Sequence, residues 1–155
     1  MDKTQLLKDV DAALAQHIEE IRKCVQTTQE MTRDAPGRIE SRYDTSREEL
    51  GWLATGQAAL LGEWEHTYAA FRTIGTEQKD LIQIGAFFEA ESLNGSVHIR
   101  CLVCYGGSGF ECETTQGPVM LVSPSSPLAA AALGHRTDDI FAVNGRMDYI
   151  IREVA

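Results

Sequence analysis

The chain up to residue 117 contains a single proline, and this restricts its first half to long, regular elements. That residue, Pro36, stands in the turn-favouring sequence Asp34-Ala35-Pro36-Gly37. Apolar residues before it recur at alternating spacings of three and four, which predicts a helix over residues 4–33. The predicted seam consists of Leu7, Val10, Leu14, His17, Ile21, Cys24, Thr28 and Met31, widened by Leu6, Ile18 and Val25.

A second helical pattern covers residues 45–74 and begins with a capping box, in which the Thr45 hydroxyl and the Glu48 carboxylate would satisfy free backbone N–H groups. Two helices around one turn predict an antiparallel coiled-coil hairpin with arms of roughly 40 Å. A compact helical bundle is the alternative, although no further long helix is predicted. The predicted seam consists of Leu50, Leu53, Leu60, Trp64, Phe71 and Ile74, with Gln57 and Thr67 as exceptions, and one of Gly51, Gly56 and Gly62 is expected to permit close helix packing.

The second half of the chain has the alternating pattern of strands. Strands are predicted at residues 81–88, 97–103, 110–114, 119–122, 140–143 and 149–154, separated by turns such as Leu93-Asn94-Gly95 and Asn144-Gly145. A short helix is expected between Ser126, as N-cap, and Gly134, at its C-terminal end. The sequence therefore predicts an α+β protein, with a hairpin over residues 1–76 whose tip is near 34–44, and a small domain over residues 77–155.

Charge argues against one class of function. The net charge is −9, and both predicted units are acidic, so neither offers the broad basic face that captures duplex nucleic acid. The first residues are polar and no apolar run is long enough to cross a bilayer. We therefore expect a soluble cytoplasmic protein with no membrane contact, whose four cysteines are reduced.

The pair Cys101-x-x-Cys104 suggests zinc or thiol chemistry. Residues three apart on a continuous strand point to opposite faces, so the prediction is two small buried side chains, with a metal or redox site as the alternative. His17 and His66 are expected to be packing or surface residues. His98 and His135 have no evident carboxylate or Cys partner in the sequence.

The second half resembles the C-terminal domain of the Gre-type transcript-cleavage factors, a bacterial family. The resemblance lies in Ser123-Pro124-Ser125-Ser126-Pro127-Leu128 through Leu133-Gly134, then Thr137-Asp138-Asp139-Ile140, Val143-Asn144-Gly145 and Tyr149-Ile150-Ile151. The segment Glu40 to Thr45 is similar to the tip of that family's hairpin. The resemblance covers nearly the whole chain and implies an FKBP-like fold for residues 77–155.

What the resemblance implies is a monomeric accessory factor, not an enzyme, that binds core RNA polymerase and inserts its tip into the secondary channel. Two tip carboxylates would help to hold a second Mg²⁺ at the polymerase active centre, so that the polymerase cleaves backtracked RNA; the factor alone would bind no cofactor. Asp44 matches the second of the family's two acidic positions, whereas the first is Ser41, next to Glu40. The implied docking residues are Ser126, Pro127, Leu128, Leu133 and Gly134.

Alternatives remain open for the tip and for the function. From the residues alone, Asp44 also suits the N-terminus of the second helix and Glu40 also suits a solvated charge. Arg38, Arg42 and Arg47, with Arg33 nearby, would contact RNA phosphates or polymerase carboxylates, or form weak local pairs. A non-cleaving regulator of the same channel is the second functional hypothesis. A prolyl isomerase, suggested only by fold analogy, is the third, although no cluster of aromatic residues in the second half would clearly line the pocket of such an enzyme.

Overall fold

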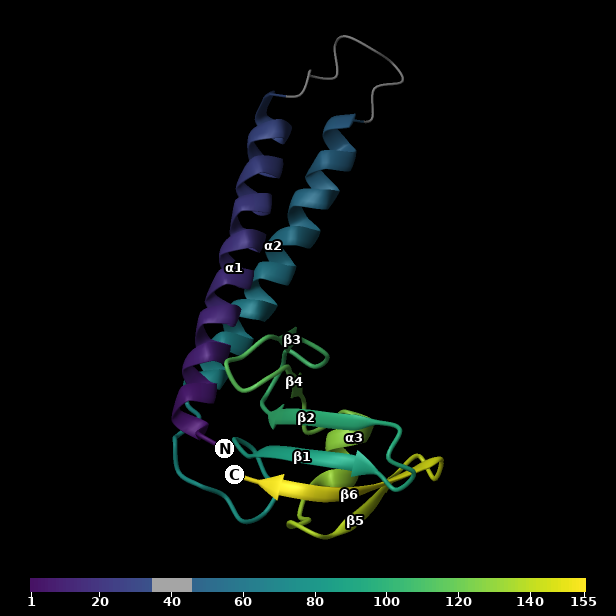
Figure 1. Ribbon diagram of the computed structural model, residues 1–155. Coiled ribbons are helices and arrows are strands. Elements are labelled where there is room, and N and C mark those ends of the chain that lie inside the picture. Colours follow the sequence, from purple (N-terminus) through teal and green to yellow (C-terminus); the bar gives the residue numbers. More distant parts are fainter. Residues whose placement is uncertain (35–45) are drawn as a thin grey trace.

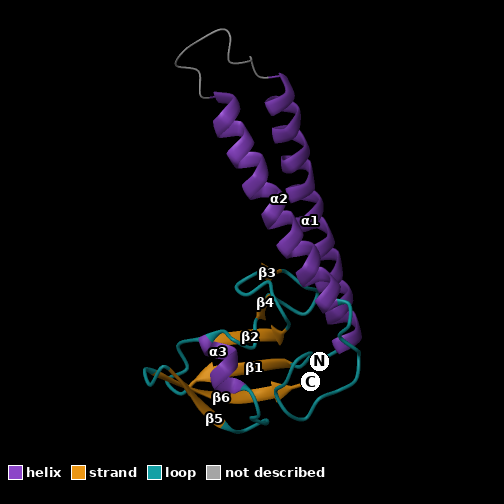
Figure 2. Ribbon diagram, turned by 180° about the vertical axis from the view of Figure 1, so that it is seen from behind, coloured by secondary structure: helices purple, strands orange, loops and turns teal. Residues whose placement is uncertain are grey.

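Two long helices project from a body built on a β-sheet in the computed structural model, which describes residues 1–34 and 46–155 (Figure 1). Helix α1 (Lys3–Asp34) has 32 residues and α2 (Ser46–Phe71) has 26, so they extend roughly 48 and 39 Å. The two helices lie side by side and run in opposite directions in both views (Figures 1 and 2). The predicted α+β class and the N-terminal pair of helices are confirmed.

The face that α1 buries departs from the predicted seam in its second half. Ile18 and Val25 are 4% and 7% exposed, whereas Cys24 is exposed and Met31 is 56% exposed. A straight helix with 3.6 residues per turn drifts by about 20° per heptad relative to a strict seven-residue repeat. The expected seam through Cys24 and Met31 was therefore wrong, because the buried stripe advances by one position along the helix.

Helix α2 also buries a face that differs from the predicted seam. Leu53 and Leu60, predicted to lie in the seam, are 50% and 44% exposed. Thr67, a polar residue at a predicted seam position, is 5% exposed and donates its hydroxyl to the Glu63 carbonyl at 3.0 Å. A Cβ atom at any of the three helix glycines would meet nothing within 4 Å, so the expected close packing at a glycine was wrong. Neither helix of the hairpin, nor any other helix among the described residues, is long and apolar enough to cross a membrane.

The sheet has six strands in the order β3-β4-β2-β1-β6-β5. Strands β2 and β4 are parallel and the other neighbours are antiparallel, with a register shift between Glu89 and Ala90 where β1 meets β6. The sheet is therefore mixed. The strands are β1 (Phe87–Ser92), β2 (His98–Val103), β3 (Glu111–Cys112), β4 (Val119–Val122), β5 (Ile140–Val143) and β6 (Met147–Val154), and the short helix α3 (Pro127–Ala132) lies between β4 and β5.

Most of these strands start close to their predicted positions, but the first does not. Residues 81–86, predicted as the start of a strand, form a loop before β1. In this loop the backbone of Ile82 pairs with Gly134 and His135, next to α3, and Gly85 has a φ of +80°. Ile82 thus packs beside α3, whereas Gln83 is exposed and Ile84 is 42% exposed. The prediction was wrong because the backbone of Ile82 bonds to the segment after α3 instead of to a neighbouring strand.

The sheet separates two hydrophobic cores. Phe87 and Phe88 are both fully buried but belong to different cores, as expected for successive strand residues that point to opposite faces. One core, here called the hairpin-side core, contains the first turns of α1 and the end of α2. The other, here called the α3-side core, lies under α3. The hairpin is therefore attached to one face of the sheet, and α3 covers the other (Figure 2).

Gly56 provides a test of helix energetics in α2. Because a Cβ at this position meets nothing within 4 Å, Gly56→Ala should increase the free energy of unfolding by about 0.5–1 kcal/mol. Urea unfolding followed by circular dichroism measures the change.

Gly106→Ala is the matched control with the opposite sign. Gly106 has a φ of +81°, and a Cβ there would lie 2.3 Å from the Thr67 hydroxyl, so this substitution should destabilise the protein. Equal effects of the two substitutions would contradict the interpretation of the helix glycines.

Candidate functional site: the hairpin and its base

The residues predicted to form the tip fall in the segment that joins α1 to α2 in the sequence and in the first turn of α2. Glu40, Asp44, Arg38 and Arg42 lie outside the described residues. Arg47 belongs to the first turn of α2, but its side chain also lies outside the description. Their roles stay predictions, and the described part of the site is the pair of helices with the base that holds them.

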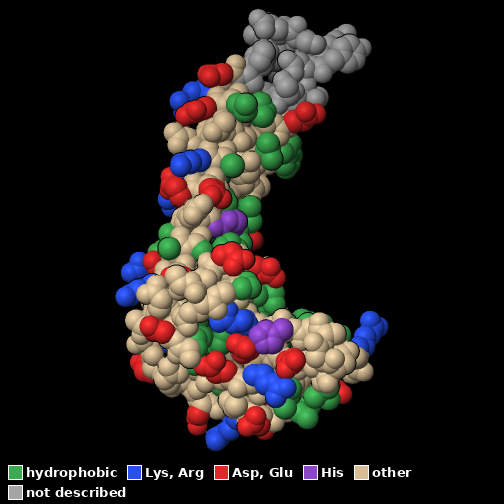
Figure 3. Space-filling view, in the orientation of Figure 1, with side chains coloured by type: hydrophobic (Ala, Val, Ile, Leu, Met, Phe, Trp, Pro, Cys, Tyr) green, Lys and Arg blue, Asp and Glu red, His purple; other side chains and the backbone are tan. Residues whose placement is uncertain are grey.

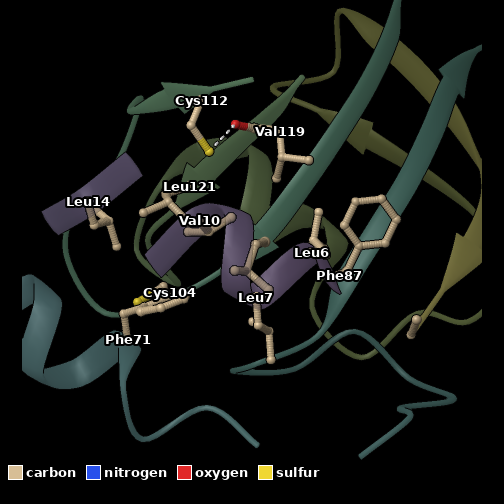
Figure 4. Packing of buried hydrophobic residues seen from close by; sticks show 12 residues of the cluster. Leu6, Leu7, Val10, Leu14, Phe71, Phe87, Cys104, Cys112, Val119 and Leu121 are labelled. Carbon is tan, nitrogen blue, oxygen red and sulfur yellow. Dashed lines mark hydrogen bonds between the residues drawn. The ribbon is translucent and has the colours of Figure 1, made fainter. Parts of the chain in front are cut away.

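The first turns of α1 form the base of the hairpin and pack against one face of the sheet. Leu6, Val10 and Leu14 are fully buried and pack in the hairpin-side core with Phe87 and Leu121 (Figure 4). Burying an aliphatic side chain of this size contributes about 1.5–3 kcal/mol. The same helix thus forms part of the core at its N-terminus and an arm of the hairpin beyond it.

Polar contacts fasten α1 to the turn between β3 and β4. The Asp9 carboxylate accepts hydrogen bonds from the backbone N–H of Thr115 at 2.8 Å and from its hydroxyl at 2.6 Å. Gln116 bonds to the backbone of Asp2 through both ends of its amide, at 2.9 and 2.7 Å. These contacts join segments more than 100 residues apart and restrict how the hairpin can move relative to the sheet.

Lys3 forms a second polar attachment, from the start of α1 to the segment after α2. Its side chain is 1% exposed and its ammonium group donates to the Glu77 carbonyl at 2.7 Å. Burial, and then the nearby Lys79 ammonium, lower the pKa of Lys3, while the Glu77 carboxylate acts in the opposite direction. A buried ammonium needs such an acceptor, so the connection from the hairpin to the sheet is held at a defined point.

An aromatic contact joins both helices to the sheet. The His17 ring lies 4.4 Å from Trp64 and 5.0 Å from Phe110, measured between ring centroids. Next to it, Gly106 and Gly107 adopt positive φ angles that let the loop after β2 approach Thr67 closely. His17 is therefore a packing residue, as the sequence predicted.

The two arms differ in the character of their outward faces. Charged side chains gather on the α1 side of the projecting arms, whereas hydrophobic side chains are exposed on the α2 side (Figure 3). Among the described residues, one ion pair connects the arms, from Arg22 to Glu65 at 2.9 Å, with both side chains about half exposed. An exposed pair of this kind contributes little to stability. Near the base, Leu14 of α1 and Trp64 of α2 pack in the same apolar cluster.

The predicted docking residues lie at α3, on the far side of the sheet from the hairpin. Ser126 caps the helix by accepting a hydrogen bond from the Ala129 N–H, and Pro127 occupies the first turn. Leu128 and Leu133 pack against the α3-side core, and Gly134 has a φ of +83° beyond the helix end. These contacts explain the residue types structurally, and their role in docking stays a prediction.

The cysteine pair follows the predicted geometry. Cys101 belongs to the α3-side core and Cys104 to the hairpin-side core, so the two thiols point to opposite faces of the sheet. Burial raises the pKa of Cys101 to about 12, with a further contribution from Glu111, and that of Cys104 to about 11. Protonated, buried thiols are unreactive. Within residues 1–34 and 46–155, no group of three or more His, Cys, Asp or Glu side chains could hold a metal.

An ionic cluster on the exposed part of the sheet was missed by the sequence analysis. Glu89 lies 2.8 Å from the His98 ring nitrogen and 3.3 Å from Arg100, so the expectation that His98 lacks a carboxylate partner was wrong. The register of β1 and β2 places Glu89 opposite Arg100 and Glu91 opposite His98. Extending the first predicted strand beyond Phe88 and pairing it with the next strand around the Asn94-Gly95 turn would have found this contact. His98 and Arg100 also line a pocket of about 190 Å³ with Glu111.

Aromatic residues of the second half form a cluster inside the core. The Phe141 ring lies 5.5 Å from Tyr149 and 6.5 Å from Phe88. All three residues are buried, at 3%, 9% and 0% exposure. Because the rings fill the α3-side core, the cluster supports folding, and it provides no support for a prolyl isomerase.

The contact between Asp9 and Thr115 should make the attachment of the hairpin dependent on pH. Hydrogen bonds from the Thr115 hydroxyl, the Thr115 backbone and Gln5 lower the pKa of Asp9 below its ordinary value of 3.8. A carboxylate with a lowered pKa stabilises the folded state above its unfolded-state pKa, and this stabilisation is lost as the pH falls through the folded-state value. Asp9→Asn should therefore lower the unfolding midpoint at neutral pH, and the difference from wild type should shrink below pH 3.8.

Thermal unfolding of both proteins across this pH range measures the effect. Asp11→Asn, which removes the same charge two residues away, serves as the control. A midpoint difference between wild type and Asp9→Asn that stays constant into strong acid would contradict the proposed role of the carboxylate.

Comparison with known proteins finds no matching family model and no matching curated protein. Among solved structures, the chain is similar to GreA factor homolog 1 (Gfh1) of Thermus thermophilus, with 18% identity, a TM-score of 0.36 and 94% of each chain covered. It is also similar to Thermus aquaticus Gfh1, with 15% identity, a TM-score of 0.40 and 92% of each chain covered. A structure of the transcription factor Gfh1 has 21% identity and a TM-score of 0.40, with 95% of this chain and 94% of that chain covered.

Proposed function

We propose that this protein is a Gre-like transcription factor that binds RNA polymerase and places its helical hairpin in the secondary channel of the enzyme. The observation that carries the proposal is a long hairpin projecting from an α+β body, with its base set into the sheet (Figure 1). The resemblance of the segment from Ser123 to Ile151 to the family's C-terminal domain supports the same function. Net charge agrees, because an acidic protein needs a partner to reach nucleic acid.

The length and the attachment of the hairpin suit the delivery of a tip side chain into a narrow channel of a partner protein. After Leu14, the last fully buried residue of α1, the helix continues for 20 residues to Asp34, which is roughly 30 Å. The base is held by apolar packing and by the contacts of Asp9 and Lys3. A rigid base makes the position of the far end predictable, and this is what a channel-inserting arm requires.

The proposed chemistry at the tip belongs to the polymerase, and the protein acts as an accessory factor. Mg²⁺ prefers carboxylate oxygens and keeps several waters, so Asp44, with Glu40, would help to hold a second Mg²⁺ at the polymerase active centre. Two metal ions stabilise the attacking and leaving oxygens of a phosphodiester, and the backtracked RNA would then be hydrolysed. Arg38, Arg42 and Arg47 would contact RNA phosphates or polymerase carboxylates.

A second function is favoured by one residue. Ser41 stands where the Gre-type cleavage factors usually carry the first acidic residue of the tip, so a single matched carboxylate, Asp44, remains. A factor with that tip would occupy the same channel and regulate transcription without promoting cleavage. Both functions share the binding step, and they separate only in an assay of RNA cleavage.

Binding is the first expected outcome. The full-length protein should be retained by core RNA polymerase in the absence of DNA, with a Kd near or below 1 μM, or about −8.2 kcal/mol. A pull-down at physiological salt measures it, with an unrelated acidic protein of similar size as control. No retention of the full-length chain above that control would overturn the proposed function.

The tip carboxylate is tested by Asp44→Asn. This change removes the charge but retains most of the capping ability, because Asn caps a helix nearly as well as Asp, so polymerase binding should persist. RNA cleavage in a backtracked complex with Mg²⁺ should fall about tenfold or more, which is at least about 1.4 kcal/mol of barrier. Equal cleavage by wild type and Asp44→Asn would remove the proposed role of Asp44.

Two further variants separate cleavage from regulation. Ser41→Asp restores the family's usual pair and should raise cleavage, whereas Glu40→Gln should lower it if the neighbouring acid acts in place of Ser41. A wild-type protein that never cleaves, but competes with a cleaving factor for polymerase, would establish the regulator.

A further inference from the structure

The apolar cores of the protein end partway along the hairpin. Among the described residues, the hairpin-side core extends along α1 as far as Leu14 and begins in α2 at Trp64, and the α3-side core contains no residue of either helix. Residues 21–34 of α1 and 48–61 of α2 therefore lie outside both cores, and these two segments are here called the outer hairpin. The outer hairpin projects beyond the sheet in both views (Figures 1 and 2).

The seam between the arms is poor in apolar side chains in the outer hairpin. Within residues 48–61, all of which the structure describes, no residue is buried. The buried and half-buried positions of the outer hairpin are Ile21, Val25, Thr28 and Thr32 on α1, and Leu50, Gly51, Ala54, Gln57 and Leu61 on α2. Because polar and small residues alternate with the larger apolar ones, the closed arms bury little apolar surface for their length.

A polar side chain without a partner occupies the middle of this seam. The side-chain oxygen of Gln57 is buried, and no described group donates a hydrogen bond to it. Gln57 precedes Glu65 by eight residues, and the Arg22–Glu65 ion pair gives the level of the two arms, so Gln57 is level with the turn between Thr28 and Thr32.

The nearest hydroxyl group on the opposite arm already has an acceptor. The Thr32 hydroxyl donates to the Thr28 carbonyl at 2.8 Å, within α1. The Gln57 oxygen therefore loses its hydrogen bonds to water when the arms close and gains none in return. A buried carbonyl oxygen without a donor opposes the closed arrangement, because water satisfies it again when the arms separate.

Backbone entropy also opposes the closed outer hairpin. Gly51 and Gly56 lie in these turns of α2, and a Cβ atom at either position would meet nothing within 4 Å. Each glycine favours the unfolded chain, and neither allows a closer contact in return. The two segments have 14 residues each, and helical segments of this length are marginal in water unless packing stabilises them.

We propose that the outer hairpin is a separate folding unit, whose arms open and close while the sheet and the base of the hairpin stay folded. The closed form is the major one, and opening returns the Gln57 oxygen to water. Because the opening takes place in the free protein, it goes beyond the proposed function and does not depend on binding to RNA polymerase. The base fixes the direction of the hairpin, while the outer arms can separate.

Hydrogen–deuterium exchange of the full-length protein, followed by mass spectrometry of its peptides, measures the opening. After correction for intrinsic exchange rates, the amides of residues 25–34 and 52–61 should be about a hundredfold less protected than those of β1 and β2, because local opening is more frequent than global unfolding. Equal protection of the outer hairpin and of these strands would overturn the inference.

Gln57→Leu tests the cause of the opening. The substitution replaces the unpartnered oxygen by apolar groups at the same place in the seam, so the protection of the outer hairpin should rise about tenfold. Gln29→Leu, the same substitution at an exposed position of α1, is the matched control and should leave protection as in wild type. Wild-type protection of the outer hairpin in Gln57→Leu would overturn the role of the Gln57 oxygen.

Ile151→Val separates an independent unit from a single cooperative one. Ile151 is fully buried in the α3-side core, so the loss of one methyl group should lower the protection of β1 and β2 severalfold. The outer hairpin should keep its wild-type protection, since its opening leaves that core intact. Equal losses in both regions would mean that the hairpin unfolds only together with the sheet, and would overturn the inference.

Discussion

The burial of the first turns of α1 in one face of the sheet is the interaction on which the rest of the structure depends. Leu6, Val10 and Leu14 are fully buried there against residues of β1, β2 and β4. Since an isolated pair of long helices gains stability mainly from packing, this contact sets both the stability of the hairpin and its direction. Because α1 belongs to both the core and the hairpin, the sheet fixes the direction in which the hairpin projects.

The two helices of the hairpin make different contacts and expose different surfaces. α1 joins the core, carries the polar attachments through Asp9 and Lys3, and exposes a charged surface. α2 contacts the sheet region mainly near its end, through Trp64, Thr67 and Phe71, and leaves its middle turns uncharged and exposed. The two arms of the hairpin therefore differ both in how they join the sheet and in the surface that they expose.

Much of the fold could be predicted from the sequence because its signals are local. Pro36, the glycine turns and the Ser126-Pro127 start of α3 restrict backbone angles wherever the chain goes. The failures concern contacts between distant segments. The start of β1 was misplaced because the backbone of Ile82 bonds to the segment after α3 instead of to a strand. The partner of His98 was missed because it depends on strand register.

The sequence by itself determined the two long helices, the α+β class and the opposite faces of Cys101 and Cys104, since periodicity and turn chemistry act over a few residues. Only the tertiary structure decided which apolar faces are buried. Leu6 and Leu53 are equally apolar, yet one is fully buried and the other is 50% exposed. Burial depends on whether another element reaches that face, because the hydrophobic effect has no direction of its own.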